Sequence, residues 1–371
     1  MWKLPTYQDL TDDQKKVIDL DFEKSHIVTG PPGSGKTVMA IYRTQAMVKA
    51  NANIIFIVYN RLLKLYTQGA LKSLMVPVDS ISTMHSWFPK WFEQTYGVGI
   101  PKLSPFEYDW VKCLDVVGKK GVLEKNRYHI IVDEGQDLPK EFYLFISNIA
   151  KTVTVFADEN QAIKENQSTI KEIKSYASID SEGFLETNFR NTKAIASVAN
   201  HFWTGVGAAP VKTLETVENG DRPTLDSDKD FSSLVEWIKL FENTHSTQQI
   251  GLLVPYTSIA KKLYNRLNSK TKNPVEIYSS DPKLSNLRQV DFSTPGLKII
   301  MWASAKGLEF DSVILPELNQ YNKMEEEADR FRRTMFVLAS RAKRELIFRY
   351  SGEMEPKIIS HLPMDLIDDF R

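Results

Sequence analysis

The sequence is poor in cysteine and in long apolar runs. Cys113 is the only cysteine among 371 residues, which excludes a disulfide scaffold and a zinc site built from a cysteine cluster. No apolar run approaches the ~18 residues that a membrane span needs, and the start lacks the apolar core of a secretory signal. We therefore expect a cytoplasmic protein with no membrane partner.

An excess of charge of either sign is also missing. The 47 Lys and Arg residues balance 47 Asp and Glu residues, so the formal net charge is zero. This balance argues against a basic coat that binds nucleic acid nonspecifically, although it leaves room for a local basic groove. A hydrophobic content of 42% with 25% charged residues excludes disorder as the main state. At roughly 150 residues per domain, the length predicts two or three domains.

Strand-like and helix-like segments alternate along the first half. Short apolar runs rich in β-branched residues, bounded by polar or turn residues, are typical of buried parallel strands. A helical pattern fills the residues between them, for example residues 37–49. This alternation predicts a parallel α/β sheet. The expected strands are residues 26–29, 54–58, 129–132 and 153–156.

The second half repeats the pattern. Turn formers and acids fill residues 205–210 and 218–230, between the two halves. The sequence therefore predicts two α/β domains, residues 1–185 and 186–355, followed by a tail at residues 356–371. The expected strands of the second domain are residues 250–254, 297–301, 312–315 and 346–348.

A phosphate-binding loop is the first motif that carries chemistry. Residues 30–37 read G-P-P-G-S-G-K-T, which fits G-x-x-x-x-G-K-[ST] between a predicted strand and a predicted helix. Its glycines let backbone N–H groups turn toward phosphate oxygens, and the helix N-terminus adds to that field. Lys36 would reach the β- and γ-phosphates of ATP, and Thr37 would hold Mg²⁺. The alternative is a glycine-rich turn. The candidate binding residues are Gly30, Gly33, Ser34, Gly35, Lys36 and Thr37.

A pair of acids follows the predicted strand at residues 129–132. Asp133 could bind Mg²⁺ from the strand end, and Glu134 could polarise the attacking water. Such a pair by itself would be read as a solvated acidic turn. Its place downstream of a phosphate-binding loop favours the catalytic interpretation.

Further motifs follow one another along the chain. They are L-T-D-D-Q at 10–14, V-Y-N-R at 58–61, T-M-H-S-W at 83–87, V-D-E-G-Q-D at 132–137, A-D-E-N-Q at 157–161, L-E-T-N-F-R at 185–190, K-G-L-E-F at 306–310 and R-R-T-M-F-V-L-A-S-R-A at 332–342. In this order they resemble the Q motif and motifs Ia to VI of superfamily 1A helicases of the UvrD, Rep and PcrA type.

The resemblance implies two RecA-like P-loop NTPase domains, each a parallel sheet flanked by helices, with ATP in the cleft between them. The implied catalytic residues are Lys36, Asp133, which also binds Mg²⁺, Glu134, which activates water, Gln161, which senses the γ-phosphate, and the arginine fingers Arg190 and Arg341. Gln14 and Phe189 would contact adenine, and Glu309 the ribose. The implied nucleic-acid contacts are Tyr59, Asn60, Thr83, His85 and Ser86.

Several of these residues have a second interpretation. Gln14 is also the N3 residue of a helix capping box that starts at Thr11. Phe189 could be a core aromatic, since aromatic residues dominate cores. Arg341 could lie on a helix surface. His85 could serve a buried capping role.

The sequence also departs from the family. It is too short for the large 1B and 2B subdomains, and only a small 1B remnant near residues 88–125 is expected. The aromatic residues there could form a local core or a binding surface. Motif III continues without the aromatics that stack on bases, although Tyr59 or Trp302 could substitute. The acidic and apolar tail could be a docking peptide or a frayed terminus.

Two functions follow. The first is an ATP-dependent single-stranded DNA translocase or helicase, with RNA as a second possible substrate. The alternative is a regulatory ATPase subunit that controls a protein partner such as a nuclease. Intact phosphate-loop and arginine motifs favour hydrolysis in both, whereas the missing aromatics favour the alternative.

Overall fold

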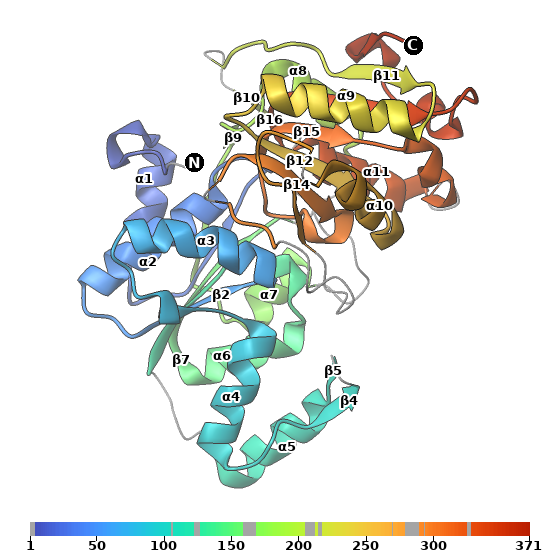
Figure 1. Ribbon diagram of the computed structural model, residues 1–371. Helices are drawn as coiled ribbons and strands as arrows, with labels where there is room; N and C mark the ends of the chain where they lie inside the picture. The colour runs from blue at the N-terminus through green and yellow to red at the C-terminus, as the bar shows by residue number, and fades with distance from the viewer. Residues whose placement is uncertain are drawn as a thin grey trace. The chain divides into compact units, whose positions relative to one another are not determined.

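The structure is a computed structural model in which two compact units are distinguished (Figure 1). One unit comprises Lys3–Gly30 and Gly35–Leu185, and the other comprises Pro31–Ser34 and Glu186–Arg371. The described residues are 4–104, 107–121, 127–158, 168–204, 212–213, 217–268, 270–278, 289–292, 294–324 and 328–371.

The N-terminal unit contains a six-stranded sheet in the order β3-β2-β6-β7-β1-β8. Every neighbouring pair in it is parallel. Its strands are β1 (His26–Thr29), β2 (Ile54–Val58), β3 (Ile81–Thr83), β6 (Tyr128–Val132), β7 (Ala150–Ala157) and β8 (Ser181–Phe184). Its helices are α1 (Asp12–Ile18), α2 (Lys36–Lys49), α3 (Arg61–Ser73), α4 (Met84–Tyr96), α5 (Trp110–Lys120), α6 (Lys140–Ile149) and α7 (Ile170–Tyr176).

The C-terminal unit contains a seven-stranded sheet in the order β13-β14-β12-β15-β16-β11-β17, again with parallel pairs throughout. Its strands are β11 (Thr224–Asp228), β12 (Gln249–Val254), β13 (Glu276–Tyr278), β14 (Gly296–Met301), β15 (Phe310–Leu315), β16 (Ala342–Ser351) and β17 (Asp368–Asp369). Its helices are α8 (Lys193–His201), α9 (Phe231–Thr244), α10 (Thr257–Leu267) and α11 (Ala328–Ala339). A separate two-stranded sheet pairs β9 (Thr187–Asn188) with β10 (Lys212–Thr213).

These sheets confirm the predicted parallel α/β class, and all eight expected strands are present. The strands β1, β2 and β6 are almost entirely buried, which is why they read as continuous apolar runs. The turn-rich interpretation of residues 218–230 is wrong in part, because β11 lies inside it. Polar residues at Asp226 and Ser227 hid this strand, which pairs with β16 and β17. Residues 205–210 lie outside the described residues.

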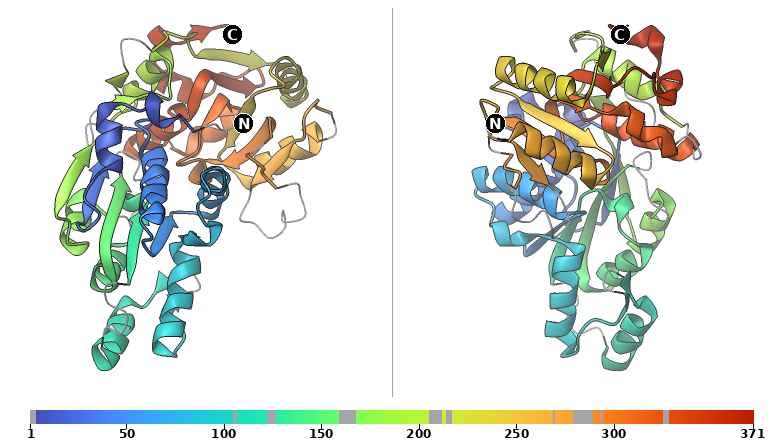
Figure 2. Two further views of the ribbon diagram at one scale, coloured as in Figure 1. Left: turned by 90° about the vertical axis from the view of Figure 1, so that its left-hand side faces the viewer. Right: turned by 45° about the vertical axis from the view of Figure 1, so that its right-hand side comes forward.

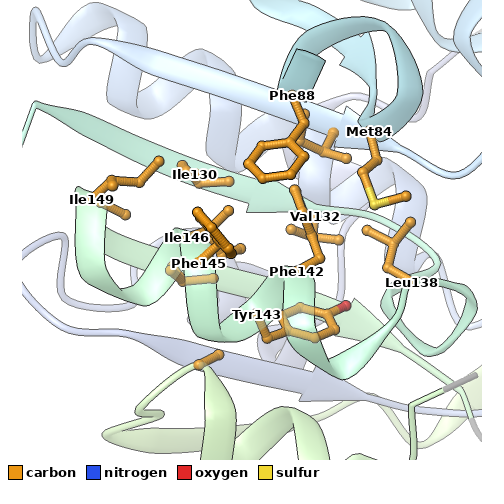
Figure 3. Packing of buried hydrophobic residues seen from close by; sticks show 14 of the residues in the cluster. Met84, Phe88, Ile130, Val132, Leu138, Phe142, Tyr143, Phe145, Ile146 and Ile149 are labelled. Carbon is orange, nitrogen blue, oxygen red and sulfur yellow. The ribbon is translucent and has the colours of Figure 1, made fainter. Parts of the chain in front are cut away.

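The aromatic residues near α4 form a local core. Phe88 and Trp91 stack with ring centroids 5.9 Å apart, and Phe88 and Trp110 do so at 5.5 Å. Phe88 also packs against Phe142 of α6 and is fully buried. Figure 3 shows Phe88 of α4 among buried side chains of α6 and β6, such as Phe142 and Val132. Helices α4 and α5, with the hairpin of β4 (Lys102–Ser104) and β5 (Glu107–Tyr108), extend beyond the sheet (Figure 2).

The interpretation of the C-terminal tail as a frayed terminus is wrong. Strand β17 continues the second sheet beside β11, and Ile367 is only 3% exposed. Arg222 forms an ion pair with Asp368 at 3.1 Å. The tail therefore packs as part of the C-terminal unit. Among the described residues, no helix is both long and apolar enough to span a membrane.

Candidate nucleotide site

Three segments that carry candidate residues meet at one edge of the N-terminal sheet. Strands β6, β7 and β1 are neighbours and parallel, so their carboxyl ends lie at the same edge, where α/β proteins bind ligands. The phosphate-binding loop follows β1, Asp133 and Glu134 follow β6, and Asp158 follows β7. Sheet topology thereby brings together residues that are far apart in the chain.

The loop before α2 has the backbone that its glycines permit. Gly33 and Gly35 have φ angles of +78° and +87°, values that favour glycine. A Cβ atom on Gly35 would lie 2.8 Å from Nε2 of Gln14, so any side chain there would collide with that amide. Glycine at this position therefore serves both the turn and the packing.

Lys36 is the first residue of α2 and is largely buried, at 8% exposure. Its Nζ donates to the carbonyl oxygen of Gly30 at 2.5 Å and lies 3.6 Å from a carboxylate oxygen of Asp158. A buried ammonium group needs such partners, because desolvation is costly. These contacts hold the lysine at the mouth of the loop.

Thr37 and Asp133 form the metal-binding candidate. The hydroxyl of Thr37 donates to a carboxylate oxygen of Asp133 at 2.7 Å. Burial, and then the neighbouring Glu134 carboxylate, raises the pKa of Asp133 to about 7. A divalent cation would relieve this repulsion. Two hard oxygen donors suit Mg²⁺, which keeps several waters and shares its other ligands with phosphates. The residues present therefore fit Mg²⁺.

The candidate base Glu134 has an unusual backbone. Its φ is +54° and its ψ is +45°, a left-handed conformation, and it is 5% exposed. The next residue, Gly135, has no room for a Cβ atom, which would lie 2.3 Å from Val155 and 2.7 Å from the Tyr143 hydroxyl. Non-glycine residues with a left-handed backbone like that of Glu134 are strained and occur often at functional sites.

Two further residues, Gln136 and Asp158, contact the candidate site residues, although the sequence alone indicated no role for them. Gln136 is fully buried, and its Nε2 donates to Glu134 at 2.6 Å while its Oε1 accepts from the N–H of Asp158 at 2.8 Å. Both lie inside motifs that were recognised, so the signal was available. Their role depends on contacts between two strands, which a motif does not reveal.

Gln14 occupies its capping position. The N–H of Gln14 donates to the hydroxyl of Thr11 at 3.3 Å, and the Gln14 side chain accepts from the N–H of Thr11 at 3.1 Å. The capping box is therefore present. The same side chain lies beside Gly35, so capping and a place next to the loop are compatible. Adenine contact remains a prediction.

In the C-terminal unit, Arg190 and Glu309 form an ion pair at 2.9 Å. Arg190 also donates to the carbonyl oxygen of Ser340 at 3.3 Å, and Lys343 lies 3.7 Å from Glu309. The backbone N–H of Arg190 donates to the side chain of Asn188 at 2.7 Å. The structure thus brings two predicted nucleotide contacts together as partners of each other.

Arg341 and Phe189 differ sharply in exposure. Arg341 is 1% exposed and donates to the carbonyl oxygens of Val337, at 2.9 Å, and Leu308, at 3.2 Å. These contacts fix the turn after α11. Phe189 is 40% exposed, which argues against the core interpretation of this ring. The predicted γ-phosphate sensor Gln161 lies outside the described residues.

The predicted nucleic-acid contacts lie at the carboxyl ends of the adjacent parallel strands β2 and β3, where Thr83 is the last residue of β3. Asn60 accepts from the N–H of Leu63 at 2.7 Å and caps α3. Thr83 is buried, whereas His85 and Ser86 are exposed at the start of α4. The His85 Nδ1 atom lies 3.0 Å from the Tyr108 hydroxyl.

Tyr59 and Trp302 are the aromatic residues that could replace the missing stacking residues. Tyr59 is partly buried and packs against the core of the N-terminal unit. Trp302 is 8% exposed and packs edge-to-face on Tyr321, with ring centroids 4.3 Å apart. Trp302 is therefore a poor stacking platform.

Comparisons with known proteins agree with the loop chemistry. Residues 14–167 match the family model of an AAA domain. No curated protein matches the chain. One solved structure, the C-terminal domain of a possible DNA helicase from Lactobacillus plantarum WCFS1, is similar with 20% identity and a TM-score of 0.36. The alignment covers 49% of this chain and 99% of that one.

Proposed function

We propose that this protein is an ATP-dependent translocase or helicase on single-stranded DNA, of the superfamily 1A type. The observation that carries the proposal is the meeting of Lys36, Thr37, Asp133 and Glu134 at one sheet edge. The AAA-domain match over residues 14–167 supports nucleotide binding. The DNA part of the proposal rests on the ordered motifs.

Each of these four residues has a task in the proposed hydrolysis. Lys36 binds the β- and γ-phosphates, and the loop N–H groups bind their oxygens. Thr37 and Asp133 would hold Mg²⁺, which neutralises charge that develops on the phosphate oxygens. Glu134 accepts a proton from the attacking water. Its buried position keeps bulk water from competing for the carboxylate.

The C-terminal unit would contribute arginines. We propose that Arg190 stabilises the charge that develops during transfer of the γ-phosphoryl group, a role worth roughly 10³–10⁵ in rate. Glu309 and the carbonyl oxygen of Ser340 orient its guanidinium. The buried contacts of Arg341 support a positioning task, and its action as a finger rests on the motif alone. Loss of the γ-phosphate would then remove a partner of these arginines and drive movement.

The second candidate is a regulatory ATPase that controls a protein partner such as a nuclease. The burial of Trp302 favours it, because base stacking contributes about 1–3 kcal/mol per base in strand binding. Without such stacking, closure around ATP would act as a switch more readily than as a stepping motor.

Steady-state ATP hydrolysis by the full chain separates the two functions. It should be measured with and without single-stranded DNA, at about 50 and about 200 mM salt. Strong stimulation that fades with salt supports the translocase. ATP binding without stimulation contradicts it and favours the regulatory ATPase. Single-stranded RNA in a parallel reaction tests the alternative substrate, and Lys36→Ala controls for contaminating ATPases.

A further inference from the structure

Gln136 is a buried amide with both of its polar ends occupied. Its NH₂ group faces the Glu134 carboxylate at 2.6 Å, and its oxygen faces the N–H of Asp158 at 2.8 Å. The side chain is 0% exposed. The opposite orientation of the amide would place its oxygen against a carboxylate, so the two partners together determine its direction.

The backbone around Glu134 leaves little freedom except in its side chain. The left-handed backbone of Glu134 and the crowded Gly135 hold the main chain in place. The Tyr143 hydroxyl reinforces this by donating to the carbonyl oxygen of Gly135 at 2.5 Å. The remaining variables are the torsions of the Glu134 side chain, and the hydrogen bond from Gln136 restrains them.

The other end of Gln136 leads toward the phosphate-binding lysine. Its oxygen holds the backbone N–H of Asp158, and the carboxylate of Asp158 lies 3.6 Å from Nζ of Lys36. The backbone oxygen of Gln136 also accepts from the N–H of Ser168 at 3.0 Å. A continuous set of contacts therefore runs from Lys36 through Asp158 and Gln136 to Glu134, within the N-terminal unit.

We propose that Gln136 is a positioning residue that aims the Glu134 carboxylate at the attacking water and couples its direction to Asp158 and Lys36. Its task is to orient the base, not to bind ATP. Binding of phosphates to Lys36 would therefore change the orientation of the Glu134 carboxylate through these contacts. The inference rests on the ATP hydrolysis proposed above and assigns a further residue to that reaction.

Gln136→Met tests this role, because methionine has a similar length but neither the N–H donors nor the amide oxygen. We expect kcat to fall about 10- to 100-fold, since a small misplacement of a catalytic group can cost on the order of 10²-fold. The dissociation constant for ATP should stay within about threefold, since Gln136 lies behind Glu134. Gln249→Met is the matched control. Gln249 is a buried glutamine of the C-terminal unit that donates to the carbonyl oxygen of Phe292 at 2.5 Å.

A double-mutant cycle distinguishes orientation from general damage. In a Glu134→Gln background, Gln136→Met should change the single-turnover rate less than threefold, because the base that it orients is gone. An equal loss in both backgrounds would overturn the proposal, as would an unchanged kcat in the single variant. Gln136→Asn, whose amide is too short to reach both partners, serves if the methionine variant does not fold. A wild-type chain without any ATPase activity would instead contradict the proposed function.

Discussion

The hydroxyl of Thr37 donates to the carboxylate of Asp133 at 2.7 Å, across 96 positions of the sequence. One residue opens the helix after β1, and the other follows β6, two strands away in the sheet. In the proposed site this pair would supply the oxygen ligands that Mg²⁺ takes from the protein, which leads to the first prediction.

Thr37→Val should lower ATP hydrolysis on the order of 10²-fold, since a positioned metal contributes several kcal/mol to such reactions. Thr37→Ser keeps the hydroxyl and should retain most activity. The measurement is the ATPase rate as a function of Mg²⁺ concentration. Equal activity of the valine and serine variants would contradict the metal-ligand role.

Glu134→Gln should reduce hydrolysis by about 10²–10⁴-fold while ATP binding persists, because an amide cannot accept the proton of the water. Lys36→Ala should lose both, since its ammonium binds the phosphates. A fluorescent ATP analogue and a phosphate-release assay measure the two properties separately. Substantial ATP turnover in either variant would contradict the catalytic roles proposed for Lys36 and Glu134. Lys49→Ala, at the exposed end of the same helix, is the control.

Arg190→Ala should lower kcat at least about 10³-fold if this arginine acts as a finger. Arg344→Ala removes an exposed arginine of the same unit and should leave kcat unchanged. Single-turnover hydrolysis at saturating ATP provides the comparison. A loss below about tenfold would restrict Arg190 to its ion pair with Glu309.

Ile367→Ala should destabilise the C-terminal unit by about 2–4 kcal/mol, the cost of removing a buried aliphatic side chain. The residue is 3% exposed, just before β17. Phe370, at 65% exposure, provides the control: Phe370→Ala should change stability by no more than about 0.5 kcal/mol. Urea unfolding of both variants tests the packed tail, and equal midpoints would argue against it.

Stability of the N-terminal unit should fall as the pH drops below about 6.5, the ordinary pKa of histidine. Burial lowers the pKa of His26 and of His129 in the folded chain. The unfolded chain then binds more protons than the folded one, so stability is fully present above about pH 6.5 and is lost below it.

His129→Gln should flatten this dependence, because glutamine can bond to the Thr152 hydroxyl without titrating. Urea unfolding at pH 7.5 and pH 5.5 measures the difference between wild type and variant. An unchanged pH dependence in the variant would exclude His129 as one of its causes.

Much of the fold could be predicted from local patterns. Strands β1 and β2 are buried on both faces, so their apolar runs stood out. Short or polar strands such as β11 could not be recognised, because they are held by their neighbours β16 and β17 rather than by their own composition. The tail was misread for the same reason, since the apolar Ile367 needs a surface that the rest of the unit provides.

The chemistry proposed for this protein could be predicted from the order of its residues. The glycines, Lys36 and Thr37 of the loop are recognisable because a phosphate-binding loop needs this spacing along the backbone, and the acids after β6 are recognisable by their place downstream of that loop. The partners of these groups follow from how the strands are arranged in the sheet. Gln136 meets Asp158 because β6 and β7 are parallel neighbours, and Arg190 meets Glu309 across 119 positions. Such contacts depend on strand order and register, which local residue preferences do not encode.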